Sequence, residues 1–202
     1  KNALSGFVNH DLWCDDITGD GSDEVLAANA DGTVYCLDSR GRLQWQFKAN
    51  DAPMNAVCVT RRDETPYIVC GGYDKSIYYL TSAGRLVKEI PSSTYSMNKP
   101  WGRNKNPKPI PPDNLHIANF LRPAPRPDGS DILAVHGAHH SMATPGTLYL
   151  FEPLENKPFK TVELEKSKPL GDMRVVDVGG RKELLFGTST HINRARMTRV
   201  RL

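Results

Sequence analysis

A stretch of sequence that occurs twice decides the fold of this chain. Its first copy is EVLAANADGTVYCLD at residues 24–38, and its second is YIVCGGYDKSIYYLT at residues 67–81. At this offset of 43 residues the apolar, acidic and aromatic positions coincide, as in the pairs Val25 and Ile68, Asp31 and Asp74, and Tyr35 and Tyr78. The correspondence continues without gaps through the Gly-Arg-Leu triplets at 41–43 and 84–86. It indicates an internal duplication.

Two further copies follow. The third begins as DILAVHG at 131–137 and resumes after an insertion as GTLYLF at 146–151; the fourth is weaker, with ELLFG at 183–187 and ARMTRVRL at 195–202. Each unit contains short alternating or continuous runs of β-branched and aromatic residues separated by turn residues, and no helical period interrupts them. Four strands in about 43 residues are typical of a β-propeller blade. The sequence therefore predicts an all-β propeller of four-stranded blades, with three complete repeats and a partial fourth.

The chain is expected to form a single partial propeller over residues 1–202. The repeats are placed at about 7–48, 55–90, 115–165 and 171–202, with a long Pro-rich, basic loop at 91–114. Because propellers close about four to eight blades into a ring, and because the fourth repeat ends after its third strand, the chain is expected to be part of a larger ring whose remaining blades lie outside it.

Two segments carry a family resemblance, DITGDGSDEVL at 16–26 and DGTVYCLDSRGRLQW at 31–45. They resemble the FG-GAP and quinoprotein-like (PQQ-like) repeat propellers, over 7–90 and more weakly over 115–165 and 171–202. The resemblance implies the propeller fold. It leaves activity open, because such repeats occur in adhesion modules, assembly scaffolds, lyases and quinone dehydrogenases alike.

The loop at 16–24 is a candidate calcium site. Oxygen-bearing side chains or a carbonyl recur at alternate positions, and Gly21 permits a sharp bend. The predicted ligands are Asp16, Thr18, Asp20, Ser22 and Glu24. FG-GAP loops often bind calcium with this pattern, so the resemblance implies one structural Ca²⁺. In the alternative reading, Asp16 and Asp20 only accept backbone hydrogen bonds that stabilise the turn.

The loop at 91–114 departs most from the repeat and is a candidate ligand-binding segment. It combines six prolines with Trp101, Arg103 and Lys105. A tryptophan ring offers an apolar face to a sugar, and flanking cations attract carboxylates, sulfates or phosphates. The alternative is a loop that covers a blade edge with solvated charges.

Propeller topology predicts that loop histidines gather on one rim near the central channel. The predicted members are His10, His116, His139, His140 and His191. A neutral imidazole can abstract a proton near neutral pH, so His140, His191 and His116 are the catalytic candidates if the protein is an enzyme of the polysaccharide-lyase kind. Scattered histidines that only make hydrogen bonds are the alternative.

Composition and charge limit the remaining classes. Net charge is only +3, which argues against a nucleic-acid partner, and the alternating arginines Arg194, Arg196, Arg199 and Arg201 are interpreted as a solvated strand face. No stretch approaches the ~18 consecutive apolar residues of a membrane span. The four cysteines lie in apolar alternating runs and are expected to be buried thiols.

These observations favour a propeller domain that recognises or processes an anionic carbohydrate at a histidine-rich, basic rim. The resemblance implies a periplasmic, cell-surface or secreted location. A non-catalytic scaffold whose rim loops contact a protein partner is the alternative, and a quinone-dependent dehydrogenase is the least favoured reading because the chain is too short for the full ring of those enzymes.

Overall fold

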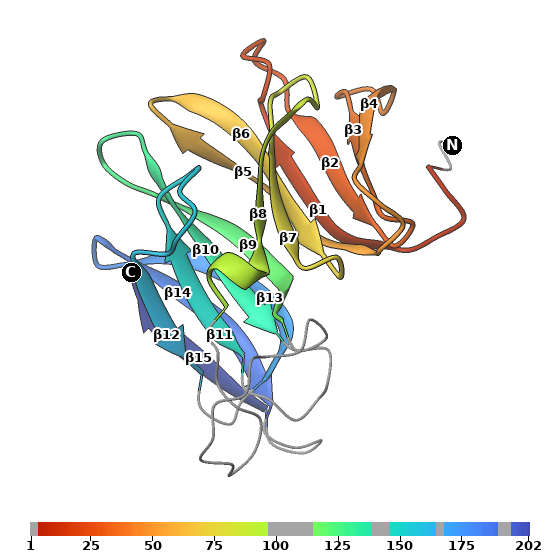
Figure 1. Cartoon of the computed structure of the whole chain (residues 1–202). Coiled ribbons are helices and arrows are strands. Elements are labelled where there is room, and N and C mark those ends of the chain that lie inside the picture. The colour runs from red at the N-terminus through yellow and green to blue at the C-terminus, as the bar shows by residue number, and fades with distance from the viewer. Residues whose placement is uncertain (1–3, 97–114, 139–145, 165–167, 190–194) are drawn as a thin grey trace.

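The chain forms four antiparallel β-sheets in a computed structural model that describes residues 4–96, 115–138, 146–164, 168–189 and 195–202 (Figure 1). Within each sheet, the strands follow one another in chain order. Within the described residues, three sheets have four strands and the last has three, so the predicted propeller of four-stranded blades with a partial fourth is confirmed.

The sheets follow one another along the chain, each built from consecutive strands. Sheet 1 contains β1 (Asn9–Asp15), β2 (Glu24–Asn29), β3 (Thr33–Leu37) and β4 (Leu43–Lys48). Sheet 2 contains β5 (Met54–Arg62), β6 (Thr65–Gly72), β7 (Ser76–Leu80) and β8 (Leu86–Pro91), followed by a short 3₁₀ turn at Ser92–Thr94. Sheet 3 contains β9 (Ile117–Pro125), β10 (Asp131–Ala138), β11 (Thr147–Phe151) and β12 (Lys160–Glu163). Sheet 4 contains β13 (Lys168–Val178), β14 (Arg181–Ser189) and β15 (Ala195–Arg201).

The duplication is visible in the register of the first two sheets. Ala27 pairs with Tyr35 in sheet 1, and their counterparts 43 residues later, Cys70 and Tyr78, pair in sheet 2. In both sheets the tyrosine hydroxyl donates a 2.7 Å hydrogen bond to the aspartate four residues before it. The sequence match at this offset therefore reflects one hairpin built twice, with the same strand pairing and the same side-chain contact across the turn.

Apolar side chains fill the space between neighbouring sheets. One cluster lies between sheets 1 and 2, a second between sheets 2 and 3, and a third between sheets 3 and 4. Because side chains alternate between the two faces of a strand, the middle strands of an inner sheet are buried on both faces, and all five residues of β7 and of β11 are buried. The first strands β1, β5, β9 and β13 contact one another in that order and line the centre of the arrangement.

The cysteines differ in part from expectation. Cys36, Cys58 and Cys70 are buried, whereas Cys14 is exposed, and all four are free thiols. Cys14 alternates with Trp13 along β1 and lies on the face of sheet 1 that is turned away from sheet 2. Within the described residues, no helix is both long and apolar enough to cross a membrane.

Candidate functional site

Most of the predicted rim lies outside the described residues. This applies to Trp101, Arg103, Lys105, His139, His140 and His191. The gathering of these side chains around a common rim therefore stays a prediction.

The described histidines already have definite partners. The Nδ1 atom of His10 donates a 3.0 Å hydrogen bond to the carbonyl oxygen of Met54, and the Nδ1 atom of His116 lies 2.7 Å from the hydroxyl of Tyr149. His136 is buried on β10 next to the ring of Phe120. Burial, assisted by the charge of His116, lowers the pKa of His136 to about 3. His136 is therefore a neutral core histidine at physiological pH.

In the loop at 16–24 the acidic side chains organise the backbone. Asp16 accepts hydrogen bonds from the N–H groups of Gly19, Asp20 and Gly21, at 2.7, 3.2 and 2.9 Å. These bonds, that of Gly21 first, lower the pKa of Asp16. Glu24 is buried and accepts a hydrogen bond from the N–H of Ile17.

The turn-stabilising role foreseen as the alternative is thus present in this loop. Asp20 adds a 2.8 Å bond from the N–H of Ser22, and Thr18 is exposed at the loop surface. Across the described ranges, no group of three or more His, Cys, Asp and Glu side chains is placed to hold a metal ion. Calcium binding by Asp16, Thr18, Asp20, Ser22 and Glu24 stays a prediction.

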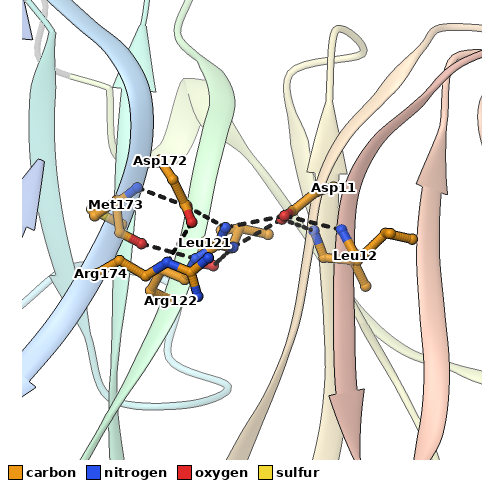
Figure 2. Close-up of polar contacts among 8 residues, drawn as sticks. Asp11, Leu12, Leu121, Arg122, Asp172, Met173 and Arg174 are labelled. Atoms are coloured by element: carbon orange, nitrogen blue, oxygen red, sulfur yellow. Dashed lines mark hydrogen bonds and ion pairs between the residues drawn. The ribbon is translucent and has the colours of Figure 1, made fainter. Parts of the chain in front are cut away.

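A buried arginine joins the inner strands at the centre of the molecule (Figure 2). Arg122 on β9 forms ion pairs with Asp11 of β1 at 2.8 Å and with Asp172 of β13 at 2.5 Å. Its Nε atom donates to the carbonyl oxygen of Met173 at 3.0 Å. Asp11 also accepts a 3.1 Å hydrogen bond from the N–H of Val57 on β5. Side chains on β1 and β9 thus connect all four inner strands.

The electrostatics of this network favour the charged form of the arginine. Burial alone would lower the pKa of Arg122, but hydrogen bonds and charge from Asp11 and then Asp172 outweigh it, and the pKa is raised. The guanidinium also lies 5.7 Å from the centre of the Trp13 ring, within the range of a cation–π contact. Arg122 therefore stays fully charged in an almost dry site.

Next to this network lies a cleft of about 400 Å³. It opens where β1, β5, β9 and β13 end and where the following strands begin. Its walls combine an aromatic ring, cations and carboxylates, supplied among others by Trp13, Arg61, Arg122, Asp131, Arg174 and Lys182.

The charges around the cleft are ordered by pairing. Arg61 forms an ion pair with Asp15, and this contact raises its pKa. Asp131 is buried, which raises its pKa, although it accepts a hydrogen bond from the N–H of Arg61. Arg174 and Lys182 form ion pairs with Asp172 and Asp177 at 2.6 and 3.3 Å, but their side chains stay 72% and 41% exposed. These two cations are the ones that a ligand entering the cleft would meet.

Sequence reasoning missed this cleft because it searched the loops. Trp13, Arg61, Arg122 and Arg174 all lie on first strands of their units. The first strands of a propeller line its centre, so charged residues in otherwise apolar strands were a usable signal. The contacts between these side chains could not be predicted in this way, because Asp11 and Arg122 are 111 residues apart in the sequence.

Comparisons with known proteins identify the relatives of this chain. The family model of the lambda-carrageenase beta-propeller domain matches residues 1–202. Two relatives named lambda-carrageenase, from Pseudoalteromonas carrageenovora and from a Pseudoalteromonas species, are each 43% identical over 197 residues. The match covers 96% of this chain and 20% of each relative, so the chain spans about one fifth of the length of the relatives it matches.

Solved structures with the same fold are much more distant in sequence. BBS1N in complex with ARL6DN matches with a TM-score of 0.66 at 11% identity, over 98% of this chain and 55% of that one. The Dos1 propeller matches with a TM-score of 0.60 at 13% identity, over 96% of this chain and 44% of that one. BamB from Moraxella catarrhalis matches with a TM-score of 0.50 at 14% identity, over 89% and 43%. These likenesses confirm the propeller, while assignment to FG-GAP or PQQ-like repeats in particular stays a prediction.

Proposed function

Because the chain belongs to the lambda-carrageenase beta-propeller domain family, we propose that it is the glycan-binding part of a protein that processes an anionic galactan. Carrageenans are sulfated galactans, so a ligand of this class presents sugar rings and sulfate groups together. A site for it needs an apolar surface next to hydrogen-bond donors of positive charge.

The observation that carries the proposal is the composition of the cleft. Trp13 supplies an aromatic ring at its wall, and Arg174 and Lys182 supply exposed cations within the same lining. Asp131 adds a buried carboxyl group that can accept hydrogen bonds from sugar hydroxyls. Arginine is suited to sulfate because its planar fork can donate two parallel hydrogen bonds to neighbouring oxygens.

The proposal concerns binding, and it moves the predicted site from the loop rim to the inner strands. Chain cleavage by histidines at the rim, in the manner of a lyase, remains a separate prediction that depends on His140 and His191 together with His116. The proposed ligand is a polymer, and we therefore place the working protein in the periplasm, at the cell surface or outside the cell. A non-catalytic scaffold for a protein partner is the competing function.

Calorimetric titration of this chain tests the proposal. A short oligosaccharide of λ-carrageenan is expected to bind, and the same oligosaccharide after chemical desulfation is expected to bind at least tenfold more weakly. The paired substitution Arg174→Gln with Lys182→Gln is expected to weaken binding of the sulfated ligand at least tenfold, because charged hydrogen bonds contribute about 1.5–3 kcal/mol each.

A matched pair of cations elsewhere serves as the control. Arg40 and Arg85 are exposed and lie in the turns between the third and fourth strands of sheets 1 and 2. Arg40→Gln with Arg85→Gln removes the same charge without touching the cleft, and binding should be unchanged. Equal losses of affinity in both double variants would show that net charge alone causes the effect. No binding of the sulfated oligosaccharide by the unmodified chain would favour the scaffold function.

A further inference from the structure

One wall of the cleft is joined into a single row of polar contacts across sheets 1, 2 and 3. Asp15 of β1 pairs with Arg61 of β5 through both terminal nitrogen atoms of the guanidinium group. Asp15 also accepts a 3.3 Å hydrogen bond from the indole N–H of Trp13. The backbone N–H of Arg61 in turn donates to the carboxylate of Asp131 on β10. These four residues, Trp13, Asp15, Arg61 and Asp131, are called the acidic wall below.

The acidic wall carries more negative than positive charge. It contains two carboxylates and one guanidinium group, and the guanidinium of Arg61 is already engaged by Asp15. Burial raises the pKa of Asp131, and the nearby charge of Asp15 acts in the same direction. The carboxylate of Asp131 therefore lies in surroundings that solvate its charge poorly.

Asp131 is held in place at the edge of the cleft. It is the first residue of β10, lines the cleft and is only 5% exposed. Its Oδ2 atom is anchored by the N–H of Arg61. A carboxylate offers about four acceptor positions, so capacity remains for hydrogen bonds from the hydroxyl groups of a ligand. An anchored, buried carboxylate cannot turn toward bulk water when an anion approaches.

The other walls of the cleft differ in chemistry. Pro123, Pro125 and Gly129 supply uncharged surface, and the exposed cations Arg174 and Lys182 lie on sheet 4. The cleft thus has one side that attracts anions and another side, the acidic wall, that repels them. A ligand with sulfate groups on every edge would satisfy the first side and conflict with the second.

We infer that Asp131 is a specificity-determining residue of the cleft, which accepts a hydrogen bond from a free sugar hydroxyl and excludes a sulfate ester from that position. This inference rests on the proposed function and deepens it, because it restricts the ligand to a partially sulfated galactan with a bare hydroxyl edge. A hydroxyl group can donate a hydrogen bond to a carboxylate. A sulfate ester has no proton to donate and brings a second negative charge, and like charges placed together in an interface are strongly unfavourable.

A purely structural role does not account for the charge of Asp131. Its contact with Arg61 ties sheet 3 to sheet 2, but an amide oxygen could accept the same N–H bond. The amide would do so without the cost of burying an ionised group. Recognition of a hydroxyl group, in contrast, benefits from the charge, because hydrogen bonds to an ionised acceptor are stronger than neutral ones.

Calorimetric titration of this chain near neutral pH tests the inference with two ligands. One is the short λ-carrageenan oligosaccharide, and the other is the same oligosaccharide after exhaustive chemical O-sulfation. The unmodified chain is expected to bind the first at least tenfold more tightly. Asp131→Asn keeps an oxygen acceptor for the N–H of Arg61 but removes the charge. We expect it to reduce this preference at least fivefold, mainly by raising the affinity for the fully sulfated ligand.

A matched variant controls for net charge. The side chain of Asp51, in the loop between β4 and β5, is 97% exposed and lies outside the cleft lining. Asp51→Asn removes the same charge as Asp131→Asn, and the preference between the two ligands should stay unchanged.

A second measurement needs no variant and therefore does not depend on the folding of Asp131→Asn. Oligosaccharides of one length and increasing sulfate content should bind the unmodified chain first more tightly and then more weakly. The decline begins when sulfate occupies the hydroxyl that Asp131 would accept. A steady rise in affinity through the fully sulfated member would overturn the inference.

The outcomes separate the two proposals. Absence of binding of every sulfated oligosaccharide to the unmodified chain would remove the proposed function. Binding of the short oligosaccharide with no preference over its fully sulfated form would overturn the inference alone. An equal loss of preference in Asp51→Asn, or a full preference in a folded Asp131→Asn, would also contradict it.

Discussion

Replacing Arg122 with methionine is the most informative perturbation of this fold. Methionine keeps an unbranched stem that can pack near Trp13, but it removes the guanidinium that joins β9 to β1 and β13. Arg122 is 5% exposed, so its partners lose a cation that water replaces poorly.

The magnitude follows from the burial of the partners. The side chain of Asp11 is 12% exposed and would become an unpaired buried carboxylate, whereas that of Asp172 is 35% exposed and keeps an ion pair with Arg174. Removing one partner of a buried ion pair costs about 3–5 kcal/mol. We expect Arg122→Met to lower the free energy of unfolding by that amount, mostly through Asp11.

Urea unfolding followed by tryptophan fluorescence and circular dichroism measures the effect. With a denaturant slope of about 2 kcal/mol per molar urea, the midpoint should fall by about 2 M. The double variant Asp11→Asn with Arg122→Met is the internal comparison. The introduced asparagine carries no charge, and its side-chain oxygen can still accept the bond from Val57. The double variant should therefore be more stable than Arg122→Met alone by about 1–3 kcal/mol.

Two results would refute this reasoning. A midpoint for Arg122→Met within about 0.5 M of the unmodified protein, about 1 kcal/mol at that slope, would mean that the network contributes little to stability. A double variant whose loss equals the sum of the two single losses would mean that Asp11 and Arg122 act independently, contrary to their contact.

Four other predictions concern separate parts of the molecule. Acidification from pH 6.5 to 5 should destabilise the protein, because burial keeps the pKa of His136 at about 3 and only the unfolded chain gains that proton. The substitution His136→Gln should flatten a plot of melting temperature against pH, and an unchanged slope would contradict this prediction. Lys75 has a φ of +66° at the turn position where the first repeat has glycine, so Lys75→Gly should raise the unfolding free energy by about 1 kcal/mol in urea titrations, and any loss would count against it. Thiol titration of the native chain should detect Cys14 alone, with all four thiols appearing in denaturant, because the remaining three are buried: Cys36, Cys58 and Cys70. Calcium should raise the melting temperature and a chelator should lower it, with both responses lost in Asp16→Asn; a melting temperature that ignores the chelator would eliminate the calcium site.

The repeat pattern was sufficient to predict the sheets because strand pairing depends on nearby residues. Alternation of apolar side chains fixes which face of a strand is buried, and turn residues such as those at 31–32 fix where the chain reverses. Both kinds of information lie within a segment of about 43 residues. Matching positions in two copies therefore led to identical registers in the hairpins β2–β3 and β6–β7.

The predicted rim and the observed cleft show what the local sequence pattern could not predict. The histidines were predicted to form a rim because their loops lie on one face of a propeller. That topological argument predicts which loops are neighbours, but it gives no distances between side chains. His136, which lies outside the predicted rim, shows the same limit, because its sequence position at a strand end gave no sign that Phe120 and the sheet around it would bury the imidazole. The charged side chains that do meet at the centre lie on strands, and in the sequence they stand out only as polar residues within apolar runs.

By itself, the sequence determined a duplicated four-stranded unit, its turns, its buried face and the basic character of the fourth unit. The tertiary structure alone decided that Asp11, Arg122 and Asp172 form one network and that Arg199 and Arg201 flank a buried Glu183. The physical reason is the range of the interactions. Hydrogen bonding and side-chain alternation within a hairpin act between residues close in the chain, whereas packing between twisted sheets brings together side chains that no local pattern relates.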